Sequence, residues 1–509
     1  MPMAKARVLD DLLARGADDA TALVTPDEDS LLRRDGLMDE VDELARTFAS
    51  VGVEQGERVA FVLQNGPECI KSLLAIASLG AAVAPLNPAY TAEEYRFYLG
   101  DISPRLLVVS AGEGDAARPA IPDGTVVADA ATDARGRIEL SVEGVSLKPG
   151  TTRTSAEPDD IGLILHTSGT TSRPKQVPLL QRNLVASADT IAEFYELTST
   201  DVSLCVMPLF HIHGLVASTL AAFAGGGSVV APRRIAPRRV WQQLSDYGVT
   251  WFSAGPTLHH MLLDRAPDGP ATPTLRFTRS CSSALSAPLF ERAEATYQVP
   301  MLEAYGMTEA SHQMSSNPLP PDARFVGSVG VATGTEIAIA DSEGRFLGHG
   351  ESGEVCIRGA GVTPGYLQNP QANADSFFDG WFRTGDQGTI DSEGYLRLVG
   401  RLKEMILRGG ENISPLEIED ALLSHPAVGE AVAFGVPDEK YGETVAAAVA
   451  LTGDVSEEEL VAYGRERLAA FKAPTAIHVL DEIPRTPTGK VQRRRIAEHI
   501  YPPERGPDA

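Results

Sequence analysis

Short apolar runs alternate with longer amphipathic stretches along the chain up to about residue 325. The runs at 58–64, 81–88 and 105–111 have the pattern of buried strands, and the stretches at 67–80 and 91–100 have that of helices. The first of these helices is expected to end at a glycine and the second to begin at a threonine, as is typical of those positions. Strands that alternate with helices in this way predict a parallel sheet covered by helices.

The pattern changes after residue 325, where short apolar runs are separated by glycines. The segments 327–341, 353–359 and 394–400 are typical of a small β-barrel or a twisted antiparallel sheet. We therefore predict an α/β fold in which stacked α/β sheets and a small β-barrel together form a large N-terminal domain.

The C-terminal hundred or so residues form a smaller unit with a mixed α and β pattern. Capping boxes, in which a serine is followed three residues later by a glutamate, predict helices that start after Ser414 and Ser456. A polar stretch able to act as a hinge puts the domain boundary at 400/401. Residues 1–400 are thus predicted to form the large domain and 401–509 a small mobile α+β domain.

Length and charge narrow the class of protein. A chain of 509 residues is too long for one core, so two or more domains are expected. The net charge of −25 argues against nucleic acid as a partner, because phosphate binding needs a positive surface. The basic run at 490–495 is typical of a solvated helix face.

No segment has the pattern of a signal peptide or of a membrane span, and the four cysteines are widely spaced without a CxxC motif. Neither a disulfide framework nor a thiolate metal site is expected. These features predict a reduced, cytoplasmic protein that has no membrane partner. The oligomeric state stays open, with a dimer as one option.

The segment HTSGTTSRPKQVPL, residues 166–179, follows the apolar run 161–165 and has the composition of a phosphate-binding loop. It combines hydroxyl donors, a glycine that lets the backbone approach a ligand, and a lysine charge. The GxxxxGK[ST] pattern is absent, which excludes a Walker-type NTPase. A polar surface turn is the alternative interpretation of the loop alone. The residues concerned are Ser168, Gly169, Thr170, Thr171, Ser172 and Lys175.

Four further segments follow the loop in order: EAYGMTE (303–309), WFRTGD (381–386), GRLKEMILRGGENISP (400–415) and PRTPTGKVQRR (484–494). With the loop, they resemble the motifs of the adenylate-forming superfamily, which includes acyl-CoA ligases, peptide-synthetase adenylation domains and firefly luciferase. The resemblance extends from about residue 50 to 500. It implies that a carboxylate is joined to the α-phosphate of ATP, that pyrophosphate leaves, and that the acyl group then passes to a thiol.

The resemblance assigns the nucleotide site. The loop at 167–175 would hold the phosphates, Glu309 would bind Mg²⁺ through oxygen, as this hard ion prefers, and Thr308 would contact the α-phosphate. Asp386 and Arg401 match the ribose contacts. The loop and adenine positions implied are Thr167, Ser168, Gly169, Thr170, Thr171 and Lys175, then Ser283, Ala284, Glu303, Ala304 and Tyr305, whose ring would stack on the base.

The resemblance also assigns the C-terminal unit. Lys490 matches a mobile lysine that bridges the carboxylate and the α-phosphate, where it offsets developing charge. Lys403 matches a hinge about which the small domain turns between the two half-reactions. The positions implied for CoA are Gly409, Gly410, Glu411, Tyr441, Phe471 and Lys472.

The sequence defines the acid substrate less well than it defines the nucleotide site. His211 matches a gate beside the carboxylate, and as an HxH pair with His213 it has no acidic or cysteine partner nearby that would indicate a metal site. Amino-acid-activating relatives place an aspartate in this segment, and its absence disfavours a substrate ammonium group.

Several segments, among them FHIHGL, RSCSSAL and MTEASHQMSSNPLP, resemble the oxalate–CoA ligase branch. The resemblance implies that His213, Ser282, Gly306 and His312 receive the acid. That branch often has alanine where Gly306 stands, so a deeper pocket is expected. A larger acid is therefore as plausible as oxalate.

Gln176 stands where that branch has glycine. Its side chain either points harmlessly outward or displaces Lys175 or the phosphates, in which case the protein would only transfer a preformed acyl-adenylate to CoA. The sequence thus predicts an AMP-forming acyl-CoA ligase that uses ATP, or an acyl-adenylate, with Mg²⁺ and CoA.

The alternative is a stand-alone adenylating enzyme that loads a carrier protein. The intact Glu309, Asp386, Arg401 and Lys490 argue against a non-enzymatic nucleotide-binding relative. Nothing in the sequence favours an oxygenase.

Overall fold

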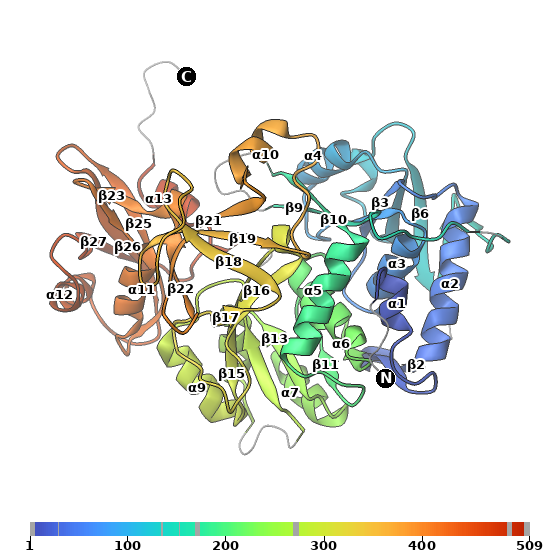
Figure 1. Cartoon of the computed structure of the whole chain (residues 1–509), viewed down its shortest axis with the longest axis horizontal. Coiled ribbons are helices and arrows are strands. Elements are labelled where there is room, and N and C mark those ends of the chain that lie inside the picture. The colour runs from blue at the N-terminus through green and yellow to red at the C-terminus, as the bar shows by residue number, and fades with distance from the viewer. Residues whose placement is uncertain are drawn as a thin grey trace.

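The computed structural model describes residues 6–28, 30–133, 136–151, 153–167, 174–267, 274–485 and 491–502. Across these ranges the chain forms two large sheets, a smaller antiparallel sheet and a C-terminal α+β unit (Figure 1). The predicted Ser168, Gly169, Thr170, Thr171, Ser172 and Lys490 lie outside the described residues.

The first large sheet has the strand order β10-β9-β4-β3-β5-β6-β7-β8. Its central strands are parallel, and helices α3 (Pro67–Ser78) and α4 (Ala92–Ile102) connect them, so the predicted alternation is confirmed. The strands are β3 (Arg58–Val62), β4 (Ala82–Pro85), β5 (Leu106–Ser110), β6 (Val126–Thr132), β7 (Ile138–Val142), β8 (Val145–Ser146), β9 (Ile161–His166) and β10 (Gln176–Leu180).

The second large sheet has the order β17-β16-β15-β14-β13-β11-β12-β1-β2. Its main apolar core also contains side chains from α2, α3, α5 and the first sheet, so the two sheets share one packed interior. The strands are β1 (Thr21–Thr25), β2 (Ser30–Arg33), β11 (Val202–Leu204), β12 (Ser228–Val230), β13 (Trp251–Ala254), β14 (Phe277–Ser280), β15 (Met301–Met307), β16 (His312–Ser316) and β17 (Val331–Ala332).

Helices cover both sheets, and a π-helix, η3 (His213–Leu220), carries one of the predicted site histidines. The remaining helices of this part are α1 (Leu9–Leu13), α2 (Arg34–Ser50), α5 (Gln181–Phe194), α6 (Ala221–Ala224), α7 (Pro237–Asp246), α8 (Pro256–Leu263) and α9 (Ala287–Tyr297). In the described part of the chain, none of the helices combines the length and apolar character needed to cross a bilayer.

The glycine-punctuated region forms the predicted antiparallel unit, with β22 paired to β21. The chain leaves this sheet at Arg401 and enters the next sheet at Ile406, so the predicted boundary at 400/401 lies beside a change of sheet. The elements are β18 (Thr335–Ala340), β19 (Gly353–Gly359), α10 (Pro370–Ser376), β20 (Phe377–Phe378), β21 (Trp381–Ile390) and β22 (Leu396–Arg401).

The C-terminal unit packs helices on a sheet of order β24-β23-β26-β25, with β27 paired to β26 (Figure 1). Its elements are β23 (Ile406–Arg408), β24 (Glu411–Ile413), α11 (Pro415–Leu423), β25 (Val428–Asp438), β26 (Gly442–Leu451), α12 (Glu457–Arg467), β27 (Ala476–Val479) and α13 (Arg493–Ile500).

The two predicted capping boxes have different outcomes. The box of Ser456 with Glu459 is confirmed at the start of α12. Helix α11 also starts after Ser414 as predicted, but the capping box there is wrong, because the Ser414 hydroxyl donates instead to the backbone oxygen of Val399 in β22. Glu417 turns to the ammonium of Lys472, 2.7 Å away. Contacts with distant segments therefore replace the local cap.

Candidate active site

The predicted acid-binding residues lie at the carboxyl ends of parallel strands, where ligands of open α/β sheets bind. Strands β13, β14 and β15 run parallel. Ser282 follows β14, Gly306 lies near the end of β15, and His312 begins the next strand. The π-helix brings His213 to the same place.

His213 and His312 form the polar end of this site. The Nδ1 atom of His213 is 3.0 Å from the Ser282 Oγ, and the two imidazole rings lie 4.9 Å apart. Both histidines are buried, and burial, followed by the positive charge of Arg279, lowers the pKa of each well below its usual value. The site therefore presents two neutral imidazoles beside a serine hydroxyl. His211 is half-buried, and its Nδ1 accepts a hydrogen bond from the His213 backbone at 3.2 Å.

The space beside Gly306 differs from the expectation. A Cβ added there would lie 2.2 Å from the backbone oxygen of His312, a residue whose φ of +109° lies in the region that favours glycine. Gly306 therefore allows two backbone segments to approach each other, and the missing methyl group does not deepen an open pocket.

The residues predicted for the ribose meet across two paired strands. Asp386 in β21 is aligned with Arg401 in β22, and the Asp386 carboxylate lies 2.9 Å from the Arg401 Nε. The Tyr305 hydroxyl donates to the same carboxylate. Burial, and then the negative charge of Asp386, raise the pKa of Tyr305. The carboxylate predicted to bind ribose is thus held between a phenol and a guanidinium.

Glu303, predicted beside the adenine, is a buried acid with one of its two oxygens unpaired. Its Oε1 accepts from the backbone nitrogen of Leu285 at 3.3 Å, and its Oε2 has no hydrogen-bond partner among the described residues. Burial raises its pKa to about 8. Ala304 is buried beside it, whereas Ser283 and Ala284 are exposed. The carboxyl group is therefore protonated at neutral pH.

Thr167 and Lys175 are the described ends of the phosphate loop, and Tyr366 connects Lys175 to Glu309. The Thr167 backbone nitrogen donates to the Lys175 carbonyl at 3.0 Å, which closes the loop. The Lys175 ammonium lies 4.3 Å from the centre of the Tyr366 ring, and the Tyr366 hydroxyl donates to Glu309 at 2.8 Å. Thr308 is half-buried at the start of the same short turn.

This donor set fits the magnesium ion that the superfamily implies. Mg²⁺ is usually bound by one or two carboxylates together with substrate phosphates and water. Glu309 supplies one oriented carboxylate beside the loop, and Lys175 supplies a positive charge next to it. Among the described residues, no group of three histidines, cysteines, aspartates and glutamates forms a protein-only metal site.

The Gln176 side chain contacts helix α4, whereas the Lys175 side chain contacts Tyr366. Its amide nitrogen donates to the backbone oxygen and to the carboxylate of Asp101, each at 2.8 Å. His166, which is paired with Gln176 across β9 and β10, contacts the same carboxylate at 2.9 Å. The side chain is thus buried against α4 and does not point outward, but the geometry favours the interpretation in which it leaves Lys175 undisturbed.

The residues predicted for CoA gather on one side of the C-terminal unit. The Gly409 backbone nitrogen donates to the Tyr441 carbonyl at 2.8 Å, and Arg408 donates to the Phe471 carbonyl at 2.6 Å. Both rings are 41% exposed. Of the other predicted members, Gly410 and Lys472 belong to the same loops and Glu411 begins β24, and the hinge residue Lys403 is exposed between the two sheets.

The sequence did not single out several residues that the structure brings to the site. Arg279 and Ser253 lie in parallel strands behind His213 and His312, Tyr366 lies between Lys175 and Glu309, and Lys440 lies 4.9 Å from the Tyr441 ring. In the segment LRFTRS, residues 275–280, Arg279 falls on the same face of a strand as Leu275 and Phe277, and this alternation was the available signal for its burial. Tyr366, in a proline- and glycine-rich loop, had no comparable signal.

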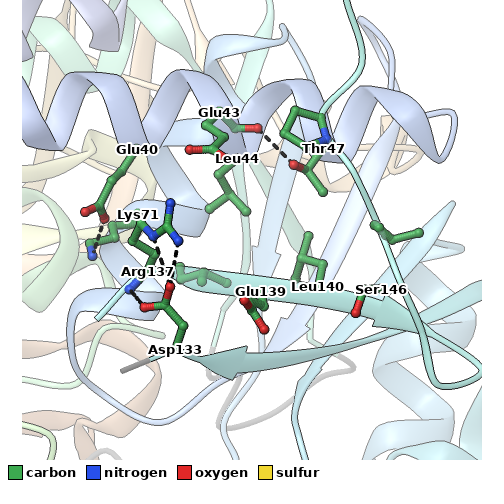
Figure 2. Close-up of a pocket in the computed structure, with 13 residues that line it drawn as sticks. Glu40, Glu43, Leu44, Thr47, Lys71, Asp133, Arg137, Glu139, Leu140 and Ser146 are labelled. Atoms are coloured by element: carbon green, nitrogen blue, oxygen red, sulfur yellow. Dashed lines mark hydrogen bonds and ion pairs between the residues drawn. The ribbon is translucent and has the colours of Figure 1, made fainter. Parts of the chain in front are cut away.

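A separate cavity of about 170 Å³ lies between α2, α3 and β7 (Figure 2). Lys71 and Glu40 approach within 2.6 Å there, and Arg137 pairs with Asp133 at 2.9 Å. None of its lining residues belongs to the predicted site.

Comparison with known proteins identifies the family. Residues 12–367 match the AMP-binding enzyme family, and residues 417–490 match the AMP-binding enzyme C-terminal domain. The chain belongs to this family. It is an AMP-forming acid–thiol ligase, and its relatives show that it is an acyl-CoA ligase. They do not favour the alternative of an enzyme that loads a carrier protein.

Two curated relatives are oxalate–CoA ligases. The one from Arabidopsis thaliana is 45% identical over 466 residues, which cover 90% of this chain and 91% of the relative. The one from Saccharomyces cerevisiae is 42% identical and covers 94% of each chain. Among solved structures, ATP-bound MatB from Rhodopseudomonas palustris has a TM-score of 0.88 at 28% identity, and the match covers 98% of this chain and 99% of MatB.

Proposed function

We propose that this ligase acts on a small acid that carries a second anionic group, with oxalate as the first candidate. The observation that carries the proposal is the contact of His213 with Ser282 beside the neutral ring of His312. A second anionic group would accept hydrogen bonds from these polar side chains, whereas an apolar acyl chain would bury them without partners. The relatives named for oxalate, sulfoacetate and 2-succinylbenzoate all act on such acids.

The first half-reaction would use the nucleotide residues described above. Asp386 and Arg401 would hold the ribose, and Thr308 would contact the α-phosphate. Glu309 would hold Mg²⁺, which when bound neutralises charge on the phosphates. Lys175 would lie beside these phosphates, and Lys490 would stabilise the charge that develops when the carboxylate attacks the α-phosphate. The remaining loop and adenine positions would orient the nucleotide.

We further propose that the chain performs both half-reactions. The contact of the Gln176 side chain with Asp101 supports this, because the amide is held by α4 while the Lys175 ammonium contacts the Tyr366 ring. A glutamine held in this way does not compete with the phosphates for Lys175.

The second half-reaction would use the C-terminal unit. We propose that this unit, residues 401–509, turns about Lys403 and brings Gly409, Gly410 and Glu411 to the acyl-adenylate. Tyr441, Phe471 and Lys472 would bind the CoA nucleotide, since they offer aromatic faces and a cation. A cytoplasmic location is part of the proposal and is supported by four buried, reduced cysteines.

A panel of acids tests the function. Oxalate, sulfoacetate and 2-succinylbenzoate are each compared with acetate and benzoate, and pyrophosphate release without CoA is followed beside thioester formation with CoA. Dianionic acids are expected to support both reactions. Lys490→Ala should lose pyrophosphate release yet still form thioester from a supplied acyl-adenylate. Preference for a monocarboxylate, or no pyrophosphate release with any acid, would contradict the proposal.

A further inference from the structure

Arg279 is a fully buried arginine with no carboxylate partner in the described part of the chain. It lies in β14 and donates to three neutral atoms: the Tyr195 hydroxyl at 3.0 Å, the Ser253 Oγ at 2.8 Å and the His312 Nδ1 at 3.3 Å. A buried charge without an opposite charge is costly, so such residues need a compensating partner. No described acidic side chain supplies one here.

The hydrogen bonds of Arg279 determine the direction of a relay through Ser253. A guanidinium only donates, so Ser253 accepts from it and has its own hydrogen available. Ser253 is fully buried, and a buried hydroxyl is rarely left without an acceptor. Among the described residues its other hydrogen-bond partner is the His213 Nε2, 2.6 Å away, which therefore accepts that hydrogen. His213 therefore carries its proton on Nδ1 and donates it to the Ser282 Oγ at 3.0 Å. The Ser282 hydroxyl hydrogen is left to donate to a further acceptor.

The second branch runs directly from Arg279 to His312. Because the His312 Nδ1 accepts from the guanidinium, the proton of this neutral imidazole is on Nε2. The rings of His312 and His213 lie 4.9 Å apart, so the two branches end close together. One buried cation thus sets the hydrogen-bonding direction of both histidines.

We propose that Arg279 is a positioning residue that selects acids with a second anionic group. Through Ser253 and His213 it turns the Ser282 hydroxyl into a donor, and through His312 it provides an imidazole N–H donor. The bound anion supplies the negative charge that the guanidinium lacks among the described residues. This inference rests on the proposed function, in which the acid lies beside His213, Ser282 and His312.

Substrate selectivity tests the proposal. Arg279→Met keeps an unbranched apolar side chain in place of the aliphatic part of the arginine and removes its charge and donors, whereas Arg279→Lys keeps the charge. Loss of the buried positive charge and of the two donors that it orients is expected to raise the KM for oxalate roughly 100-fold in Arg279→Met, while the KM for acetate and for ATP changes by less than about 3-fold. Arg279→Lys should regain part of the preference for oxalate.

Arg34 provides a matched control. It is equally buried, and it donates to the backbone oxygens of Leu13, Gly226 and Gly227, far from the predicted site. Arg34→Met should lower the melting temperature without changing the oxalate-to-acetate ratio. If Arg279→Met is also merely less stable and keeps that ratio, the proposal is overturned.

A measurement of the histidine tautomers tests the relay without turnover. Nitrogen NMR of the full-length protein labelled at histidine should show His213 protonated on Nδ1 and His312 on Nε2 at neutral pH. Arg279→Met should release His312 from this form, and the opposite tautomers in the wild type would overturn the relay. A wild type that prefers monocarboxylates overturns the substrate proposal even if the tautomers agree, so the two failures are distinguishable.

Discussion

The side-chain amide nitrogen of Gln176 lies 2.8 Å from a carboxylate oxygen of Asp101 and 2.8 Å from its backbone oxygen. The same carboxylate contacts His166 on the neighbouring strand at 2.9 Å. Both strands that flank the phosphate loop are therefore attached to the end of α4. The glutamine that stands in place of the expected glycine therefore helps to hold the two strands that flank the loop.

Gln176→Gly should therefore weaken the protein without improving adenylation. The change removes a buried side chain and its hydrogen bonds, which corresponds to a loss of roughly 1–3 kcal/mol in the free energy of unfolding. Pyrophosphate release in the absence of CoA should stay equal or fall. Denaturant unfolding and a pyrophosphate assay measure the two effects, and a faster release in the variant would contradict this explanation. Gln176→Glu, which puts a second carboxylate beside Asp101, should be at least as unstable.

Tyr366→Phe should raise the Mg²⁺ concentration needed for adenylation. The variant keeps the ring beside Lys175 and removes the hydroxyl that donates to Glu309 at 2.8 Å. Loss of a group that orients a metal ligand typically weakens metal binding about 10- to 100-fold. Pyrophosphate release is measured across a Mg²⁺ titration. Tyr395→Phe is the control, because the Tyr395 hydroxyl donates to the backbone of Ala323 elsewhere, and an equal shift in both variants would refute a specific role.

Glu303 should make stability fall as the pH rises. Its pKa is about 8 in the folded protein against an ordinary value of 4.5, so between these values the folded state binds one more proton than the unfolded state. The free energy of unfolding therefore decreases across this window, by ~1.4 kcal/mol per pH unit from this group, and levels off above the folded pKa. Glu303→Gln removes the contribution. Unfolding of both proteins from pH 5 to 9 should show a difference that grows up to about pH 8 and is constant beyond it. Parallel curves would contradict the prediction.

Lys472→Glu should weaken CoA binding and leave adenylation unchanged. Lys472 lies 5.7 Å from the Phe471 ring, on the surface that we propose for the CoA nucleotide. Reversal of its charge would repel the phosphates, so the KM for CoA should rise about 10-fold or more. Arg467→Glu is a control in the same unit, since Arg467 lies over the ring of Tyr463, outside that surface. Thioester formation and CoA-independent pyrophosphate release are measured for both variants. Equal effects would argue against this surface.

The sequence alone predicted much of the architecture. The strands at 58–64 and 105–111, the helix that begins after Thr91 and the antiparallel region after 325 all follow from the spacing of apolar residues and glycines. These are properties of neighbouring positions along the chain, because side chains alternate with a period of two in strands and 3.6 in helices. The ordered motifs indicated the ligase family for the same reason, since each is a continuous segment.

Tertiary structure decided which polar groups meet. Ser414 had the pattern of a helix cap, but its hydroxyl donates to Val399 in another sheet. The contact of Gln176 with Asp101, 75 residues away, selects between two interpretations that the sequence left open. Arg279 depends on residues from several separate elements and on the absence of a described carboxylate beside it. The partner of a buried polar group is whatever the fold brings within hydrogen-bonding distance, and spacing along the chain does not contain that information.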